Sequence, residues 1–128
     1  MFKGIEHVAI AAKNTDALSK WYCDVLDFSV AYKNAKTPAT YFVRGGCGSM
    51  IEIIPANDAS PVVHDEKDAG LRHLAITVDD FDAACSDLKA KGVSFIAAPK
   101  EASGGVKLVF FTDPEGNLLH LIYRPNPL

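Results

Sequence analysis

The sequence predicts an α+β fold made of two tandem βαβββ modules, and two internal repeats are the basis of this prediction. The pattern of residues 5–10 (IEHVAI) returns at residues 71–76 (LRHLAI), so that His73 lies 66 residues after His7. Residues 50–54 are matched by residues 118–122, so that His120 lies 68 residues after Glu52. Each of the four segments has the side-chain alternation of a β-strand. A repeat at a nearly constant offset indicates a duplicated structural unit.

The first module is expected to occupy residues 1–55. Its first strand covers residues 4–12, and Asn14 or Thr15 is the N-cap of a helix with apolar residues at helical spacing. Three more strands are predicted over residues 28–35, 40–44 and 49–54. The last of these stops at Pro55, because proline cannot donate to a strand ladder.

A polar linker over residues 56–70 is predicted to precede the second module, residues 71–128, so that residues 1–128 form a single domain. Asp79 or Asp80 caps its helix, and Gly92 ends it. The inward-facing residues of this helix are expected to be Phe81, Ala84, Cys85 and Leu88. The strands are predicted over residues 71–78, 93–98, 107–112 and 118–124, with a loop over residues 99–105 and a turn over residues 113–117.

Four side chains able to bind a metal occupy matching places in the two modules: His7, Glu52, His73 and His120. A module's helix covers one face of its sheet, so two bare sheet faces are expected to curve together into a cup with these residues on its floor. A lone histidine in an apolar strand is usually a hydrogen-bonded core residue. Burying the Glu52 carboxylate without a cation or a hydrogen-bond donor, however, would cost several kcal/mol. Three imidazoles and one carboxylate favour a divalent transition metal: Zn, Ni, Co, Fe(II) or Mn.

Composition excludes several classes of protein. A net charge of −3 without a basic run argues against nucleic-acid binding. No apolar run reaches the roughly 18 residues that cross a bilayer, which predicts a soluble protein without a membrane partner. The first residues lack the pattern of a secretory signal, so a cytoplasmic location is expected. Cys23, Cys47 and Cys85 are expected to be reduced thiols.

Several other residues were weighed for a place in the site. His64 is interpreted as a solvated linker residue in preference to a lid residue. Three cations on predicted strands are candidates for a substrate carboxylate or phosphate, or are exposed: Arg44, Arg72 and Lys107. Four aromatic residues either line the cup or fill the core: Tyr41, Phe110, Phe111 and Tyr123.

Residues 5–10, 70–80 and 111–121, taken in this order, resemble the vicinal oxygen chelate superfamily, which includes glyoxalase I, fosfomycin-resistance proteins, methylmalonyl-CoA epimerase and extradiol dioxygenases. The resemblance covers the whole chain and implies the glyoxalase-like fold. It also implies that the four matched residues hold or surround one divalent metal ion. The fourth position is usually a carboxylate in the family, so His120 is a departure. A homodimer is expected, with the two modules of a site coming from one chain or from two.

The resemblance implies a metal-dependent lyase or isomerase similar to glyoxalase I. It would act on a small α-hydroxycarbonyl compound or hemithioacetal through a metal-stabilised enediolate. Glu52 is the candidate catalytic base, because it is the one acid among the four residues. Two alternatives remain at this point. One is an extradiol-type dioxygenase with Fe(II), and the other is a small-molecule binding or resistance protein without catalysis.

Overall fold

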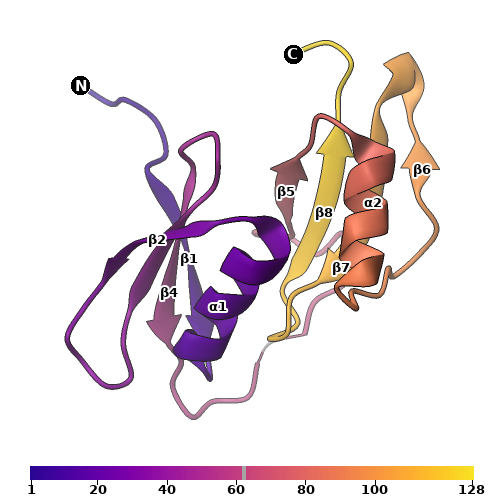
Figure 1. Cartoon of the computed structure of the whole chain (residues 1–128). Helices are drawn as coiled ribbons and strands as arrows, with labels where there is room; N and C mark the ends of the chain where they lie inside the picture. The colour runs from indigo at the N-terminus through magenta and orange to yellow at the C-terminus, as the bar shows by residue number, and fades with distance from the viewer. Residues whose placement is uncertain (62) are drawn as a thin grey trace. The chain divides into compact units, whose positions relative to one another are not determined.

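The computed structural model describes residues 1–61 and 63–128 of the chain. The chain divides into two compact units, Met1–Pro61 and Val62–Leu128. The division falls inside the predicted linker, residues 56–70. One residue of this linker, Val62, lies outside the described residues. The described residues of each unit form one α-helix and a four-stranded mixed sheet, which confirms the predicted α+β fold (Figure 1). No helix of the described residues is long and apolar enough to span a bilayer.

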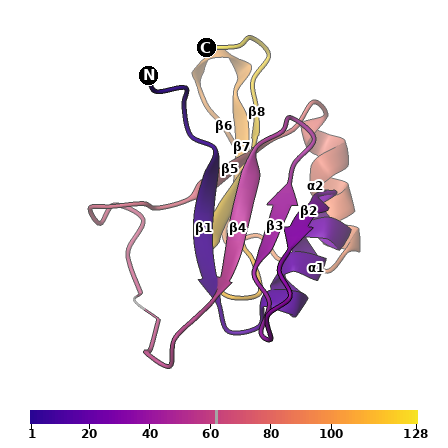
Figure 2. The ribbon, with the colours of Figure 1, turned by 90° about the vertical axis from the view of Figure 1, so that its left-hand side faces the viewer.

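The first unit has the element order βαβββ. Its elements are β1 (His7–Ala12), α1 (Thr15–Leu26), β2 (Ser29–Lys33), β3 (Tyr41–Arg44) and β4 (Met50–Pro55). Figure 2 shows the sheet order β1-β4-β3-β2. Strand β1 runs parallel to β4, and the other neighbours are antiparallel. The first and last strands of the unit therefore lie side by side.

Helix α1 covers one face of this sheet. Of the two predicted N-caps, Asn14 is the one observed, and its side chain accepts a hydrogen bond from the backbone N–H of Ala17 at 2.9 Å. The apolar stripe of the helix buries Leu18, Tyr22 and Val25. On the strands, alternate residues that include Val43, Ile51 and Ile53 are buried. The intervening residues of the strands therefore lie on the sheet's other face, which the helix does not cover.

The second unit repeats this order with one short addition, a 3₁₀-helix. Its elements are β5 (Leu74–Thr77), α2 (Phe81–Ala90), β6 (Lys100–Glu101), the 3₁₀-helix η1 (Ser103–Gly105), β7 (Lys107–Thr112) and β8 (Leu118–Tyr123). The sheet order is β5-β8-β7-β6, with β5 parallel to β8. The order of strands in the second sheet thus corresponds to that in the first.

Helix α2 begins after Asp80, whose side chain accepts from the backbone N–H of Ala83 at 3.0 Å. Phe81, Cys85 and Leu88 are buried as predicted, while Ala84 is only partly buried. The chain leaves the helix through Gly92, whose φ of +83° is a conformation that glycine adopts without strain. The buried strand residues of this unit include Val109, Phe111, Leu119 and Leu121.

The first strand of each unit begins later than predicted. Strand β1 starts at His7 instead of residue 4, and β5 starts at Leu74 instead of residue 71, so His73 precedes its strand. The reason is the register, since β1 pairs His7 with Met50 and β5 pairs Leu74 with Leu119. Residues upstream of His7 would face the turn that precedes β4, where there is no ladder to join. In the second unit the pairing begins one residue into β8.

The predicted strand over residues 93–98 and the loop over residues 99–105 are also wrong. Residues 93–98 make only an isolated bridge between Phe95 and Phe111, whereas β6 (Lys100–Glu101) lies in the predicted loop. The pairing of Phe95 with Phe111 is out of register with that of Lys100 with Leu108. Pro99 lies in this break and has no N–H to donate. The strand is therefore interrupted between residues 96 and 99.

Candidate functional site

The open face of the first sheet brings together two of the four predicted site residues. The parallel register of β1 and β4 places Ala9 beside Glu52. His7 extends toward the same carboxylate, and its Nε2 lies 3.3 Å from Oε2 of Glu52. The side chains of His7 and Glu52 are 33% and 25% exposed. The small side chain of Ala9 leaves this pair accessible.

His7 has a second carboxylate partner that the sequence analysis did not identify. Its Nδ1 hydrogen-bonds with Oε2 of Glu6. This bond raises the pKa of His7 above its ordinary value; burial opposes the rise, and the charges of Glu6 and Glu52 add to it. A carboxylate on Nδ1 fixes the orientation of an imidazole and leaves Nε2 for a ligand. The only sequence signal was the position of Glu6 next to His7.

The geometry of the first pair fits metal binding. Two ligand atoms that each lie about 2.1 Å from one ion, at tetrahedral or octahedral angles, are roughly 3.0–3.4 Å apart. The 3.3 Å between Nε2 of His7 and Oε2 of Glu52 falls in that interval. The negative charges that favour a protonated His7 would equally favour a metal cation at that position.

The open face of the second sheet brings together the other two residues. The ring centroids of His73 and His120 are 4.5 Å apart. Ala75 pairs with His120 across β5 and β8, as Ala9 pairs with Glu52 in the first unit. Phe110, which faces His120 across β7 and β8, stacks on its ring at 4.8 Å with an interplanar angle of 27°. His73 also meets the Phe110 ring edge-on at 5.6 Å.

His120 is a buried imidazole with an unused nitrogen. It is only 6% exposed, and its Nδ1 has no hydrogen-bond partner among the described residues. Burial lowers the pKa of His120, and the positive charges of His73 and Arg124 lower it further. A neutral imidazole is the form that binds metal ions. A metal ion, or a hydrogen-bond donor on a ligand, would satisfy this nitrogen.

Each pair has a phenylalanine neighbour, and the two phenylalanines occupy matching positions in the two units. Phe110 was among the predicted candidates, whereas Phe42 was not. Phe42 pairs with Glu52 across β3 and β4, and its ring meets that of His7 edge-on at 5.2 Å. Phe110 lies 68 residues later, the same offset that separates Glu52 from His120. The repeat signal was therefore present, although it could be recognised only with the strand register known.

The remaining candidates lie in other environments. Tyr41 and Phe111 are buried on the helix-covered faces, and Tyr41 donates a hydrogen bond to Asp16 at 2.5 Å. Arg72 donates to the backbone carbonyls of Gly70 and Asp65 at 3.3 and 3.4 Å. The other four have exposed or partly exposed surroundings: Arg44 near Met50, His64 near Asp68, Lys107 near Asp82, and Tyr123 at the end of β8. None of these contacts adds a ligand to either pair.

The four predicted ligands thus occur as two pairs, His7 with Glu52 and His73 with His120. In the part of the chain that the structure describes, no group of three or more His, Cys, Asp or Glu side chains has an arrangement suited to a metal ion. Each unit contributes one pair at corresponding positions, with His73 immediately before β5 and the other three residues on strands. The assembly of both pairs into one site stays a prediction.

Two βαβββ units, each with metal-competent side chains on the open face of its sheet, define the vicinal oxygen chelate class of small-molecule-binding proteins. The family model of the Glyoxalase/Bleomycin resistance protein/Dioxygenase superfamily matches residues 4–121, and the chain belongs to this superfamily.

Relatives and solved structures agree with this assignment. A probable lactoylglutathione lyase of Vibrio cholerae is 30% identical over 122 residues, covering 92% of this chain and 88% of the relative. The mitochondrial methylmalonyl-CoA epimerase of Mus musculus is 29% identical over 118 residues, covering 87% of this chain and 66% of the relative. The crystal structure of a glyoxalase family protein from Enterococcus faecalis has a TM-score of 0.78 and 29% identity, covering 94% of this chain and 98% of that one.

The three cysteines should differ in reactivity because their surroundings differ. A hydrogen bond with Ser49 lowers the pKa of Cys47, which is exposed in the turn before β4. Burial raises the pKa of both Cys23 and Cys85. A lowered pKa means more reactive thiolate at a given pH. We expect iodoacetamide to modify Cys47 first. The rate for Cys47 should rise at a lower pH than the rates for the other two thiols.

Mass spectrometry of peptides after brief alkylation at several pH values measures these rates. Ser49→Ala is the matched variant, because it removes the hydrogen bond and leaves Cys47 exposed. It should move the Cys47 profile to higher pH. Equal rates for the three thiols, or a profile unchanged in Ser49→Ala, would contradict the prediction.

Proposed function

We propose that the protein is a divalent-metal-dependent lyase or isomerase that acts on a small α-hydroxycarbonyl compound or hemithioacetal. In this proposal His7, Glu52, His73 and His120 bind one transition metal ion. The observation that carries it is the pair of matched half-sites, in which the 3.3 Å separation of His7 and Glu52 suits two ligands of one ion. The buried, unpartnered Nδ1 of His120 supplies further support.

The proposed chemistry divides between the metal and the protein. A bound divalent ion supplies Lewis-acid stabilisation of negative charge on a substrate oxygen. Glu52 takes the proton from the carbon beside the carbonyl group and returns it to the product. Glu6 would hold the His7 ring through its Nδ1, so that Nε2 faces the metal position beside Glu52. The Phe42 ring would pack against His7, and the Phe110 ring against His120, on the apolar side of each pair.

The named relatives support this reaction class, because one is called a probable lyase and another an epimerase. The superfamily name also covers resistance proteins and dioxygenases. Neither of those activities has a specific observation in its favour here. Catechol-dependent oxygen uptake would favour a dioxygenase, and saturable ligand binding without bound metal or turnover would favour a resistance protein.

Metal content is the direct test. We expect protein purified without chelator to contain about one divalent transition metal ion per site, and His73→Ala to lose it. His64→Ala is the matched control, because His64 is a linker histidine 3.8 Å from Asp68 and belongs to neither pair. Elemental analysis of the three proteins, before and after reconstitution, measures the result. Metal absent from the reconstituted wild type, or retained by His73→Ala, would contradict the proposed site.

We also propose a homodimer, and a mixing experiment tests whether the two pairs of a site belong to one chain or two. His7→Ala removes a ligand from the first pair, and His73→Ala removes one from the second. If a site uses pairs from two chains, refolding the variants together restores intact sites in mixed dimers. If each site uses one chain, mixing restores none. Metal content and size-exclusion chromatography with light scattering measure both results.

A further inference from the structure

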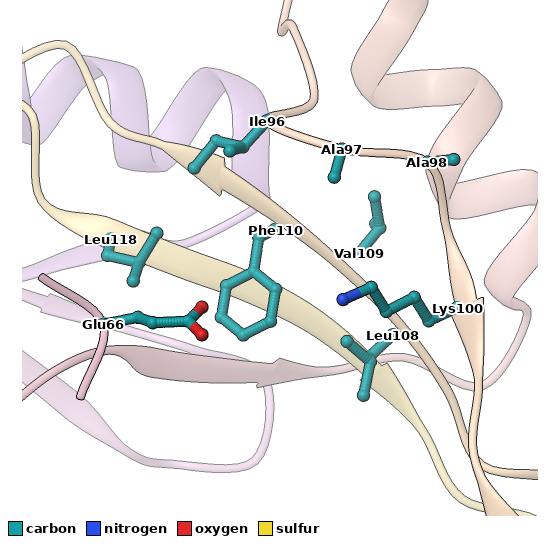
Figure 3. A pocket seen from close by; sticks show the side chains of 9 residues that line it. All are labelled: Glu66, Ile96, Ala97, Ala98, Lys100, Leu108, Val109, Phe110 and Leu118. Carbon is teal, nitrogen blue, oxygen red and sulfur yellow. The ribbon is translucent and has the colours of Figure 1, made fainter.

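A pocket opens in the second unit where the strand after α2 is interrupted. Its volume is about 240 Å³, and Figure 3 shows the side chains that line it. Leu108, Phe110 and Leu118 come from the open face of β7 and β8, and Ala97 lies in the opposite wall. The register break around Pro99 keeps residues 97–98 out of the ladder and thereby leaves this space.

The size and lining of the pocket indicate an apolar occupant. A dry cavity of about 150 Å³ lined by apolar side chains binds benzene, whereas pockets for drug-sized ligands start near 300 Å³. A volume of about 240 Å³ suits one ring, or a branched alkyl group, with a short chain attached. The two alanines in its wall, Ala97 and Ala98, leave this room, and larger side chains there would fill it.

Two charged side chains reach this apolar surface. Figure 3 shows the Lys100 amine and the Glu66 carboxylate pointing toward Phe110 from opposite sides. Lys100 belongs to β6 and pairs with Leu108 in the ladder, so the sheet fixes its backbone. Glu66 lies in a hydrogen-bonded turn, so the pocket carries one charged side chain of each sign. The Lys100 amine can pair with an anionic group on a ligand that fills the apolar space.

We propose that this pocket binds the aryl or branched-alkyl part of a small carboxylate, with Lys100 pairing with the carboxylate. The inference rests on the proposed function, because it describes the α-hydroxycarbonyl substrate of that function as one that also carries a carboxylate and an apolar group. Phe110 connects the pocket to the proposed metal ligands, because its ring lines the pocket and stacks on His120 at 4.8 Å. A ligand in contact with Phe110 thus lies against the residue that packs on the second half-site.

Three isosteric probes test the pocket in metal-free protein: phenylpropanoate, phenylpropanol and phenylpropylamine. Nuclear magnetic resonance titration should show saturable shifts at Ala97, Leu108 and Phe110 for the neutral alcohol. We expect the anion to bind about two- to fivefold more tightly than the alcohol, the range typical of an exposed ion pair. The amine should bind no more tightly than the alcohol. The absence of saturable shifts at these residues with any probe would overturn the proposal.

Three variants complete the test. Lys100→Met should remove the preference for the anion and retain the alcohol, while Glu66→Gln should preserve or strengthen that preference. Ala97→Phe fills the pocket and should abolish binding of all three probes. Retained anion preference in Lys100→Met, or unchanged binding in Ala97→Phe, would also overturn the proposal. Because no metal is present, failure here is separate from failure of metal binding at His73.

Discussion

Replacing Glu52 with glutamine is expected to lower turnover by about a hundredfold to ten-thousandfold, the usual contribution of a general base. The amide keeps the size of the carboxylate but cannot accept the substrate proton and carries no negative charge. The substrate for this test is the hemithioacetal formed from methylglyoxal and glutathione. Turnover at saturating substrate and metal content are measured on the same preparation, so that a lost base is distinguished from a lost metal.

Glu101→Gln is the matched control for this prediction. Glu101 is an exposed carboxylate on β6 and takes no part in either pair of predicted ligands. Its replacement should leave turnover and metal content unchanged. A Glu52→Gln protein that retained metal and full activity would assign the base to another residue. Loss of activity accompanied by complete loss of metal would show that the carboxylate is primarily a ligand.

Replacing Phe111 with alanine is expected to reduce the free energy of unfolding by about 3–5 kcal/mol. Phe111 is 0% exposed on the helix-covered face of the second sheet, and it forms the isolated bridge with Phe95. Removal of its ring leaves a cavity in the core. Domains of this kind are stable by only about 5–15 kcal/mol, so the change is a large share of the total.

Phe110→Ala is the matched control, because adjacent strand residues point to opposite faces. Phe110 is only partly buried, on the open face beside His120. We expect a smaller loss of stability from Phe110→Ala, with a clear effect on metal and probe binding. Equal destabilisation by the two substitutions would contradict the assignment of faces.

Urea unfolding followed by two probes measures both variants. Far-ultraviolet circular dichroism reports the secondary structure of both units. Fluorescence of Trp21, the one tryptophan of the chain, reports the first unit, because this residue lies in α1. If the two units unfold together, Phe111→Ala shifts both transitions to lower urea. If the second unit unfolds independently, the Trp21 transition stays in place and only the circular dichroism shifts.

The sequence by itself determined the class of fold and the choice of candidate ligands. Helix signals are local, because an N-cap such as Asn14 or Asp80 and the apolar stripe behind it act within a few residues. The repeats were readable for the same reason, since both copies keep the alternation of their strands. They predicted that His7 and His73, and likewise Glu52 and His120, occupy corresponding places.

Strand ends and neighbouring side chains required the tertiary structure. A strand exists only where a partner supplies a ladder, so β1 begins opposite the first residue of β4 and β5 begins opposite the second residue of β8. The same partner register brings Phe42 beside His7 and Phe110 beside His120, contacts between residues far apart in the chain. The interruption at Pro99, which opens the pocket, likewise depends on how residues 95–101 align with β7. Register is a property of two paired segments, and one segment's pattern does not contain it.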